Sequence, residues 1–130
     1  MKKLFAWGLV ALVTALVITP AQAQAGRSER WTVGDVGTLD LATVCITSKG
    51  AEDVLKWLIA HAKEMVSNGD FAKHGCSWGR DVSVKYLGIV DGVAPVIAPD
   101  LTFLVVRIAD PVSGLEGFSW FASNAIDPGI

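Results

Sequence analysis

Residues 51–67 read AEDVLKWLIAHAKEMVS, and their apolar positions have the spacing of an amphipathic helix. Side chains that recur at intervals of three and four residues share one face of a helix. The members of this stripe are Val54, Leu55, Leu58, Ile59, Ala62, Met65 and Val66. Ser48 is a candidate N-cap before the helix, and Asn68-Gly69 is a stop signal after it. We therefore predict one helix over residues 51–67 that buries this stripe.

The segments on either side of this helix have the composition of β-strands. Residues 38–47 are rich in β-branched side chains, and residues 81–90 alternate between apolar and polar side chains. Residues 101–109, LTFLVVRIA, are almost wholly apolar, as expected of a central strand buried on both faces. Residues 117–123 complete a hairpin with this strand, and residues 93–98 fit a short edge strand limited by prolines.

The elements follow the order of one strand, one helix and then three or four strands, with a loop predicted over residues 71–80. This order is typical of an α+β domain in which one amphipathic helix packs on a small antiparallel sheet. A small bent β-barrel with one capping helix is the alternative. Residues 26–130 comprise 105 residues, which suffice for one core, and we predict that they form a single small α+β domain.

The first 25 residues have the composition of an export signal. Lys2 and Lys3 precede residues 4–18, a stretch without charge, and Ala21-Gln22-Ala23 supplies the small residues that a signal peptidase requires. The uncharged stretch is shorter than the roughly 20 residues that a transmembrane helix needs. We therefore predict that residues 1–25 are a signal peptide and that the mature domain is periplasmic or secreted, without stable membrane insertion. An uncleaved N-terminal anchor is the alternative.

Cys45 and Cys76 are the two cysteines of the chain. In an exported domain of this size an even number of cysteines indicates a disulfide, and two cysteines allow one pairing. A pair of free or metal-bound thiols is the alternative, because His74 lies two residues before Cys76. A zinc site normally has four ligands, and His61 is the only other histidine. We therefore expect a disulfide, with no metal site and no cofactor.

The charge of the mature chain disfavours two classes of partner. Loss of Lys2 and Lys3 with the signal lowers Lys+Arg from 11 to 9 against 13 Asp+Glu, which gives a net charge of −4. No cluster of basic residues exists that could neutralise phosphates, so we expect binding neither to nucleic acid nor to an anionic membrane surface. The sequence also lacks a phosphate loop and the GxSxG, SxxK and HExxH motifs, so we assign no catalytic residues.

Three residues are candidates for binding a partner: Trp57, His61 and Trp78. Trp57 projects away from the centre of the apolar helix stripe and lies beside His61 at helical spacing. Trp78 belongs to the segment expected to lie near that helix face. Exposed tryptophans are common anchors of protein interfaces. A packing role is the alternative, because large aromatic side chains also fill the cores of small domains.

These observations predict an exported, non-enzymatic binding module whose partner is a protein or another component of the cell envelope. An inhibitor or immunity-type protein is one concrete version of this function. A small hydrolase that uses Cys76 with His74, or a pair of carboxylates, is the second hypothesis. A structural envelope component, which would self-associate or keep its signal, is the third.

Export is tested by the intact mass of the protein recovered from cells that secrete it. A signal peptidase that recognises the small residues before either site should leave a chain that starts at Gln24 or Gly26. Recovery of the full-length chain in the membrane fraction would instead support the uncleaved anchor.

Overall fold

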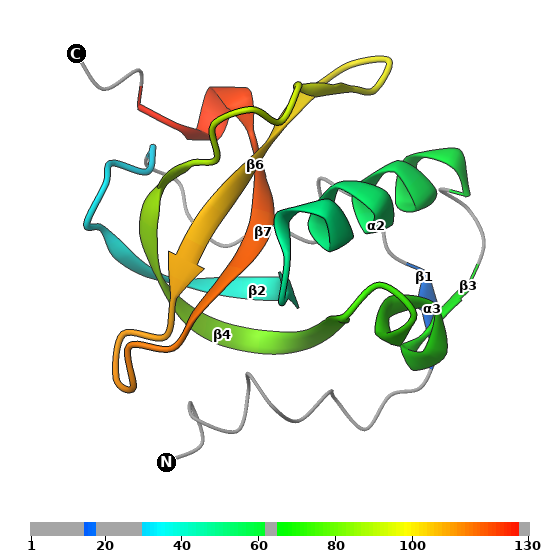
Figure 1. Ribbon diagram of the computed structural model, residues 1–130, viewed down its shortest axis with the longest axis horizontal. Helices are drawn as coiled ribbons and strands as arrows, with labels where there is room; N and C mark the ends of the chain where they lie inside the picture. Colours follow the sequence, from blue (N-terminus) through cyan, green and yellow to red (C-terminus); the bar gives the residue numbers. More distant parts are fainter. Residues whose placement is uncertain (1–14, 18–29, 62–64, 128–130) are drawn as a thin grey trace.

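The computed structural model of the protein describes residues 15–17, 30–61 and 65–127 (Figure 1). Within these ranges, no helix has the length and apolar character needed to cross a bilayer. The elements in chain order are β1 (Ala15–Val17), β2 (Val36–Cys45), α2 (Ser48–Ala60), β3 (Met65–Ser67), α3 (Asn68–Ala72), β4 (Cys76–Ile89), β5 (Val96–Ile97), β6 (Thr102–Ala109), β7 (Glu116–Ala122) and the 3-10 turn η2 (Ser123–Ala125).

β4 is the longest of the described strands, and it closes an antiparallel sheet into a small barrel. It pairs with β2 from Cys76 to Lys85 and with β6 from Lys85 to Ile89. β6 pairs with β7 along its length, and β7 bridges to β2 where Phe118 faces Cys45. Among the described residues, β2, β4, β6 and β7 thus form a ring, and β5 pairs with the start of β6. The predicted α+β domain is confirmed, and its sheet has the barrel form given as the alternative.

β4 curves around the molecule because its backbone departs from regular strand geometry at two points (Figure 1). Asp81 adopts a φ of 53°, a left-handed conformation that aspartate tolerates better than most residues. The register shifts between Tyr86 and Gly88, and Gly88 has a φ of 130°. A β-bulge of this kind bends a strand and increases its twist, which lets β4 turn from β2 to β6.

The β6–β7 hairpin separates two apolar clusters in the described part of the chain. Because side chains alternate along a strand, Phe103 and Val105 face α2, whereas Val106 and Ile108 face the opposite side. The cluster beneath the helix, here the helix-side core, contains Leu41, Cys45, Ala51, Val54, Leu55, Leu58, Phe71, Cys76, Trp78, Val96, Phe103, Val105 and Trp120. The cluster on the other side, here the barrel core, contains Trp31, Leu39, Ala42, Val82, Val84, Tyr86, Val106, Ile108, Phe121 and Ile126.

The barrel core is closed by an aromatic group that joins the two ends of the domain. The Trp31 ring stacks on Phe121 with ring centroids 4.9 Å apart, and Tyr86 lies 5.5 Å from Phe121. The Trp31 backbone NH donates to the carbonyl of Ala125 at 2.7 Å, and the NH of Asp127 donates back to the Trp31 carbonyl at 2.8 Å. Burial raises the pKa of Tyr86, because the ionised phenolate would lose its hydration.

α2 packs its apolar face on the hairpin, as the helical spacing predicts. Val54, Leu55 and Leu58 are buried, and Ile59 is half-buried against the helix-side core. The N-cap is Thr47, whose Oγ1 accepts a hydrogen bond from the NH of Gly50 at 3.0 Å. The predicted cap, Ser48, is instead the first residue of the helix.

The prediction that the helix continues to residue 67 is wrong. The helix ends at Ala60, because His61 leaves the helical conformation with φ −120° and ψ 38°. Met65–Ser67 then form β3, which pairs with β1, and the predicted stop signal Asn68-Gly69 begins α3. Ala62 and the side chains of Met65 and Val66, which we assigned to the stripe, lie outside what the structure describes.

β1 lies within the predicted signal peptide, whereas the rest of that segment and both expected cleavage positions fall outside the described residues. β1 pairs antiparallel with β3, from Ala15 opposite Ser67 to Val17 opposite Met65. This two-stranded sheet is separate from the barrel sheet. Cleavage of the signal would therefore remove a partner of β3 and leave every strand of the barrel in place.

Truncation of Leu58 should destabilise the domain, because its side chain is completely buried in the helix-side core. Leu58→Ala is expected to lower the free energy of unfolding by about 2–5 kcal/mol, the sum of lost transfer energy and the cavity left behind. Lys56→Ala, an exposed position on the same helix, should change it by no more than about 0.5 kcal/mol. Denaturant unfolding measures both values, and equal costs would show that the buried face has been assigned incorrectly.

Candidate functional site

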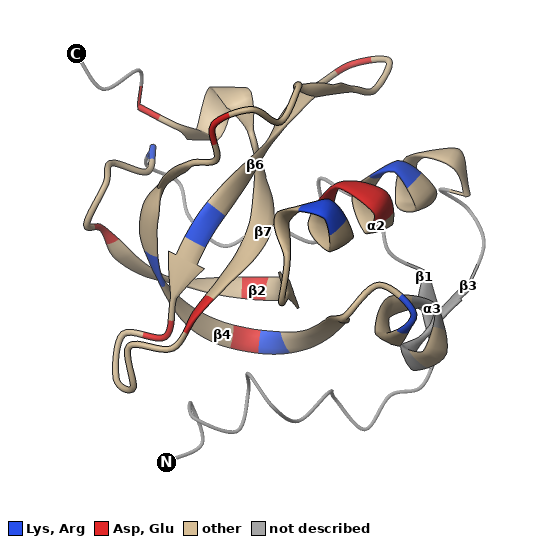
Figure 2. Cartoon of the chain, in the orientation of Figure 1, with Lys and Arg blue, Asp and Glu red and all other residues tan. Residues whose placement is uncertain are grey.

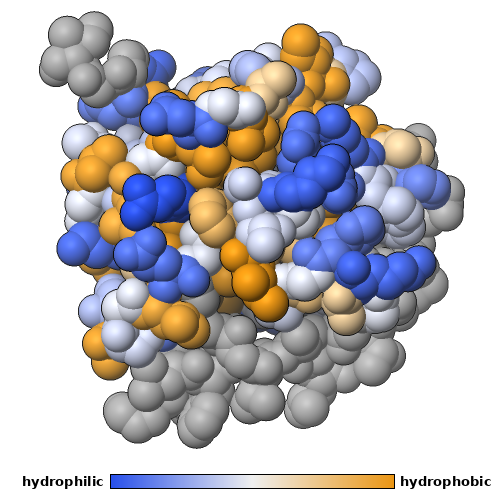
Figure 3. Space-filling model, viewed as in Figure 1, coloured by the Kyte–Doolittle hydropathy of each residue, from blue (hydrophilic) through white to orange (hydrophobic). Residues whose placement is uncertain are grey.

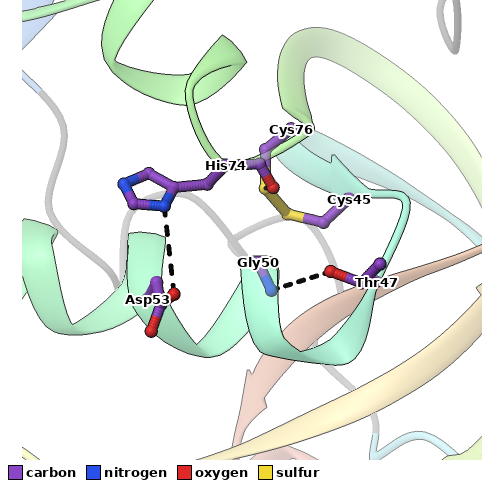
Figure 4. The surroundings of a disulfide bond; sticks show 6 residues. All are labelled: Cys45, Thr47, Gly50, Asp53, His74 and Cys76. Atoms are coloured by element: carbon purple, nitrogen blue, oxygen red, sulfur yellow. Dashed lines mark hydrogen bonds and ion pairs between the residues drawn. A yellow bond between two sulfur atoms is a disulfide. The ribbon is translucent and has the colours of Figure 1, made fainter.

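The Cys45–Cys76 disulfide joins the end of β2 to the start of β4, as predicted (Figure 4). The NH of Ile46 donates to the carbonyl of Gly75 at 3.0 Å, so the adjacent pair, Cys45 with Cys76, is a non-hydrogen-bonded pair of the ladder. Side chains approach most closely at such pairs, and the two Cα atoms lie 4.0 Å apart. Neither cysteine is free, so the thiolate that a Cys76 nucleophile would need is absent from this form of the protein.

The segment before Cys76, which contains His74, packs against the first turns of α2. A Cβ atom at Gly50 would collide with the carbonyl oxygen of His74, so only glycine allows this close approach. The ring of His74 points towards Asp53, with its Nδ1 3.9 Å from Oδ2 (Figure 4). The disulfide, the Gly50 contact and this pair together hold the helix start against the sheet. Sequence analysis did not reveal the contact or the pair, because they join residues more than a helix turn apart in the chain.

Two ion pairs on α2 neutralise its charged side chains. Lys49 Nζ lies 3.0 Å from Asp53 Oδ1, and Lys56 Nζ lies 3.1 Å from Glu52 Oε2, both at four-residue spacing. The hydrogen bond to Asp53 raises the pKa of Lys49. Figure 2 shows these positive and negative residues next to each other along the helix. The helix surface is therefore polar without a strong charge of either sign.

Trp57 and His61 form a stacked pair at the C-terminal end of α2. Their ring centroids are 4.5 Å apart, and the ring planes differ by 19°. His61 Nδ1 donates to the carbonyl of Trp57 at 2.9 Å, and Nε2 is the other polar atom of the ring. Both side chains are half-buried, and Trp57 also packs against the helix-side core. We call the four residues Lys49, Asp53, Trp57 and His61, which follow one side of the helix, the α2 stripe.

The four described tryptophans have different environments. Trp31, Trp78 and Trp120 are at most 2% exposed, whereas Trp57 reaches the surface. Trp78 lies on β4 in the helix-side core, because residues 71–80, predicted as a loop, contain the end of α3 and the start of β4. Its ring therefore fills the core and does not face a partner directly. Its Nε1 has no hydrogen-bond partner among the described residues.

A hollow of about 480 Å³ lies beside the disulfide. It is lined by Val44, Cys45, Ile46, Ala72, Gly75, Cys76, Ser77, Leu115 and Glu116. No residue of α2 contributes to it, so the hollow and the α2 stripe are distinct surfaces. The hollow brings together β2, α3, β4 and the start of β7, and no local pattern in the sequence marks such a meeting point.

Several carboxylates of the described residues accept hydrogen bonds or form ion pairs that stabilise the fold. Asp110 is buried at the β6–β7 turn, where its Oδ1 accepts from the NH of Val112 at 2.8 Å and of Ser113 at 3.4 Å. Aspartate commonly stabilises a turn by accepting hydrogen bonds from the backbone NH groups that follow it. In the described part of the chain, no group of three His, Cys, Asp or Glu side chains is arranged to hold a metal ion.

Comparison of the chain with known protein families, with curated proteins and with solved structures found no match.

The substitution Gly50→Ala tests the close contact between Gly50 and the carbonyl oxygen of His74. Alanine normally stabilises a helix relative to glycine by about 1 kcal/mol. Here the added methyl group must displace the His74 carbonyl, so we expect a loss of about 1–3 kcal/mol in the free energy of unfolding, as for overpacked sites. Ser48→Ala, in the same helix turn, is the control and should be nearly neutral because Thr47 supplies the cap. A Gly50→Ala variant as stable as the parent would contradict this contact.

Proposed function

We propose that the protein is an exported, non-enzymatic binding module of the cell envelope that contacts a protein partner through the α2 stripe. The single observation that carries this proposal is the position of Trp57. It is the tryptophan that reaches the surface among those the structure describes, and it is stacked on His61. Tryptophan is one of the residue types most enriched at the energetic centres of protein interfaces.

The stripe is held in place before any partner arrives. Thr47 caps the helix, the disulfide fixes the segment before it, and the Gly50 contact with His74 seats its first turn. A surface that is already ordered loses less conformational entropy on binding, which favours affinity. This rigidity supports recognition of a partner more than it supports a mobile catalytic loop.

The polar groups near the stripe support binding in preference to catalysis. Both cysteines are used in the disulfide, and the carboxylates of Asp53 and Glu52 are paired with lysines. The same pairs neutralise Lys49 and Lys56, so the helix offers no row of positive charges for nucleic acid. Recognition would therefore depend on aromatic contact and on hydrogen bonds such as one made by His61 Nε2.

The disulfide and the net charge bear on where the protein acts and on what kind of partner it binds. A disulfide persists in the periplasm or outside the cell, where thiols are not kept reduced, so Cys45–Cys76 supports an exported location. An inhibitor or immunity-type protein that binds an envelope-attacking enzyme is the version that we favour. The net charge of −4 after signal removal is compatible with a basic target.

Trp57→Ala tests the stripe. Loss of an interface anchor of at least about 2 kcal/mol corresponds to binding about 30-fold weaker, so the partners that the parent captures from an envelope extract should be lost. Trp57 also touches the core, so the melting temperature should fall by a few degrees, as for about 1 kcal/mol in a domain of this size, and the variant should stay folded.

The control is Lys56→Ala, the preceding residue, which is exposed and lies outside the stripe. It should capture the same partners as the parent. Equal capture by folded Trp57→Ala and by the parent would contradict a role for the stripe in binding.

A further inference from the structure

The hollow beside the disulfide is bordered by exposed apolar side chains. Ile46 is 77% exposed and Leu115 is 61% exposed, and both line the hollow. Val112, in the same β6–β7 turn as Leu115, is 64% exposed. Single exposed apolar residues are ordinary, but two on the wall of one hollow, with a third in the adjoining turn, form an apolar patch, and such patches mark interaction surfaces. Figure 3 shows apolar areas between polar ones on the visible face of the molecule.

Ile46 is a fixed projection at the edge of this hollow. Its NH is bonded to the carbonyl of Gly75, and its side chain lies over Gly75, where a Cβ would be 3.7 Å from Ile46 Cδ1. Gly75 has a φ of 71°, a backbone conformation that favours glycine. The backbone pairing orders the residue although its side chain faces solvent.

Glu116, the one charged residue among the described residues that line the hollow, is paired with Arg107. Arg107 Nη2 lies 3.1 Å from Glu116 Oε1 across the β6–β7 hairpin, and Glu116 lines the hollow. Both side chains are about half exposed, at 47% and 58%. A surface with one sign of charge would repel a copy of itself, whereas Arg107 of one copy can face Glu116 of another.

We propose that this surface binds a second copy of the chain, with Ile46 of each copy seated in the hollow of the other. In a two-fold dimer both copies contribute the same patch of surface. The projecting side chain and the hollow that receives its counterpart must therefore lie in one patch of the chain. Ile46 meets this condition because it lines the hollow and projects beside it. The Arg107–Glu116 pair adds charge complementarity under the same symmetry.

This dimer is independent of the proposed function. Its surface comprises β2, α3, β4 and β7, whereas the α2 stripe contributes no residue to the hollow. Association of copies can therefore fail while partner capture through Trp57 persists, and the reverse also holds. The contact closes on itself, so it differs from the open assembly that a structural envelope component would form.

The test is the molar mass of the exported, purified protein, measured by sedimentation equilibrium over a range of concentrations. The parent should approach twice the mass of one chain as its concentration rises. Ile46→Lys should stay monomeric over the same range, and Leu115→Lys should do so as a second, independent variant. Both side chains are exposed, so circular dichroism and thermal unfolding of the dilute variants should match those of the parent.

Ile97→Lys is the matched control. Ile97 is also 77% exposed, but it lies on β5, away from the residues that line the hollow. This variant should form the dimer as the parent does. A parent that stays monomeric, a dimer that persists in both Ile46→Lys and Leu115→Lys, or a parent that forms a series of larger species would each overturn the proposal.

Discussion

The cross-strand pair of Cys45 with Cys76 lies where β2, β4 and β7 meet, and the rest of the structure depends on this junction. It sets the point at which β4 begins, so that β4 runs beside β2 and still reaches β6 to close the barrel. α2 starts directly beyond it, at Ser48. The disulfide closes a sequence separation of 31, and such a bond reduces the conformational freedom of the unfolded chain. One covalent contact therefore supports the ring of strands and the start of the helix.

The same junction supports two surfaces that share no residue. On one side, the approach of His74 to Gly50 seats α2 and presents Trp57 and His61. On the other side, the backbone bond between Ile46 and Gly75 holds the border of the apolar hollow. A rigid centre with a surface on each side is well suited to a small protein that recognises partners, because neither surface must become ordered on binding.

The packing of the sheet explains why so many aromatic side chains are buried in a chain of this size. The β6–β7 hairpin is covered on both faces, so Trp120 faces the helix-side core while Phe121 faces the barrel core. Trp31 closes the barrel core, and its backbone is bonded to the segment around Ala125. The beginning and the end of the described domain are thus held together by the same residue. Three of the four described tryptophans are buried in this packing, and Trp57 is the one that reaches the surface.

The sequence by itself determined the features that depend on local pattern. Helical spacing identified the buried residues Val54, Leu55 and Leu58, an apolar run identified β6, and the presence of two cysteines in a predicted exported chain identified the disulfide. Each of these signals lies within one element or in simple composition, so no knowledge of distant contacts was needed.

Only the tertiary structure decided where the helix ends, where β4 begins and which tryptophan is exposed. Helical spacing continues beyond His61, yet Met65–Ser67 pair with β1. Segment 71–80 contains the start of β4, because β2 supplies the hydrogen bonds of that strand. Trp57 and Trp78 are the same residue type, and their burial differs because one lies at the side of α2 and the other between α2 and the sheet. Strand pairing and burial join residues far apart in the chain, and a local pattern carries no information about those partners.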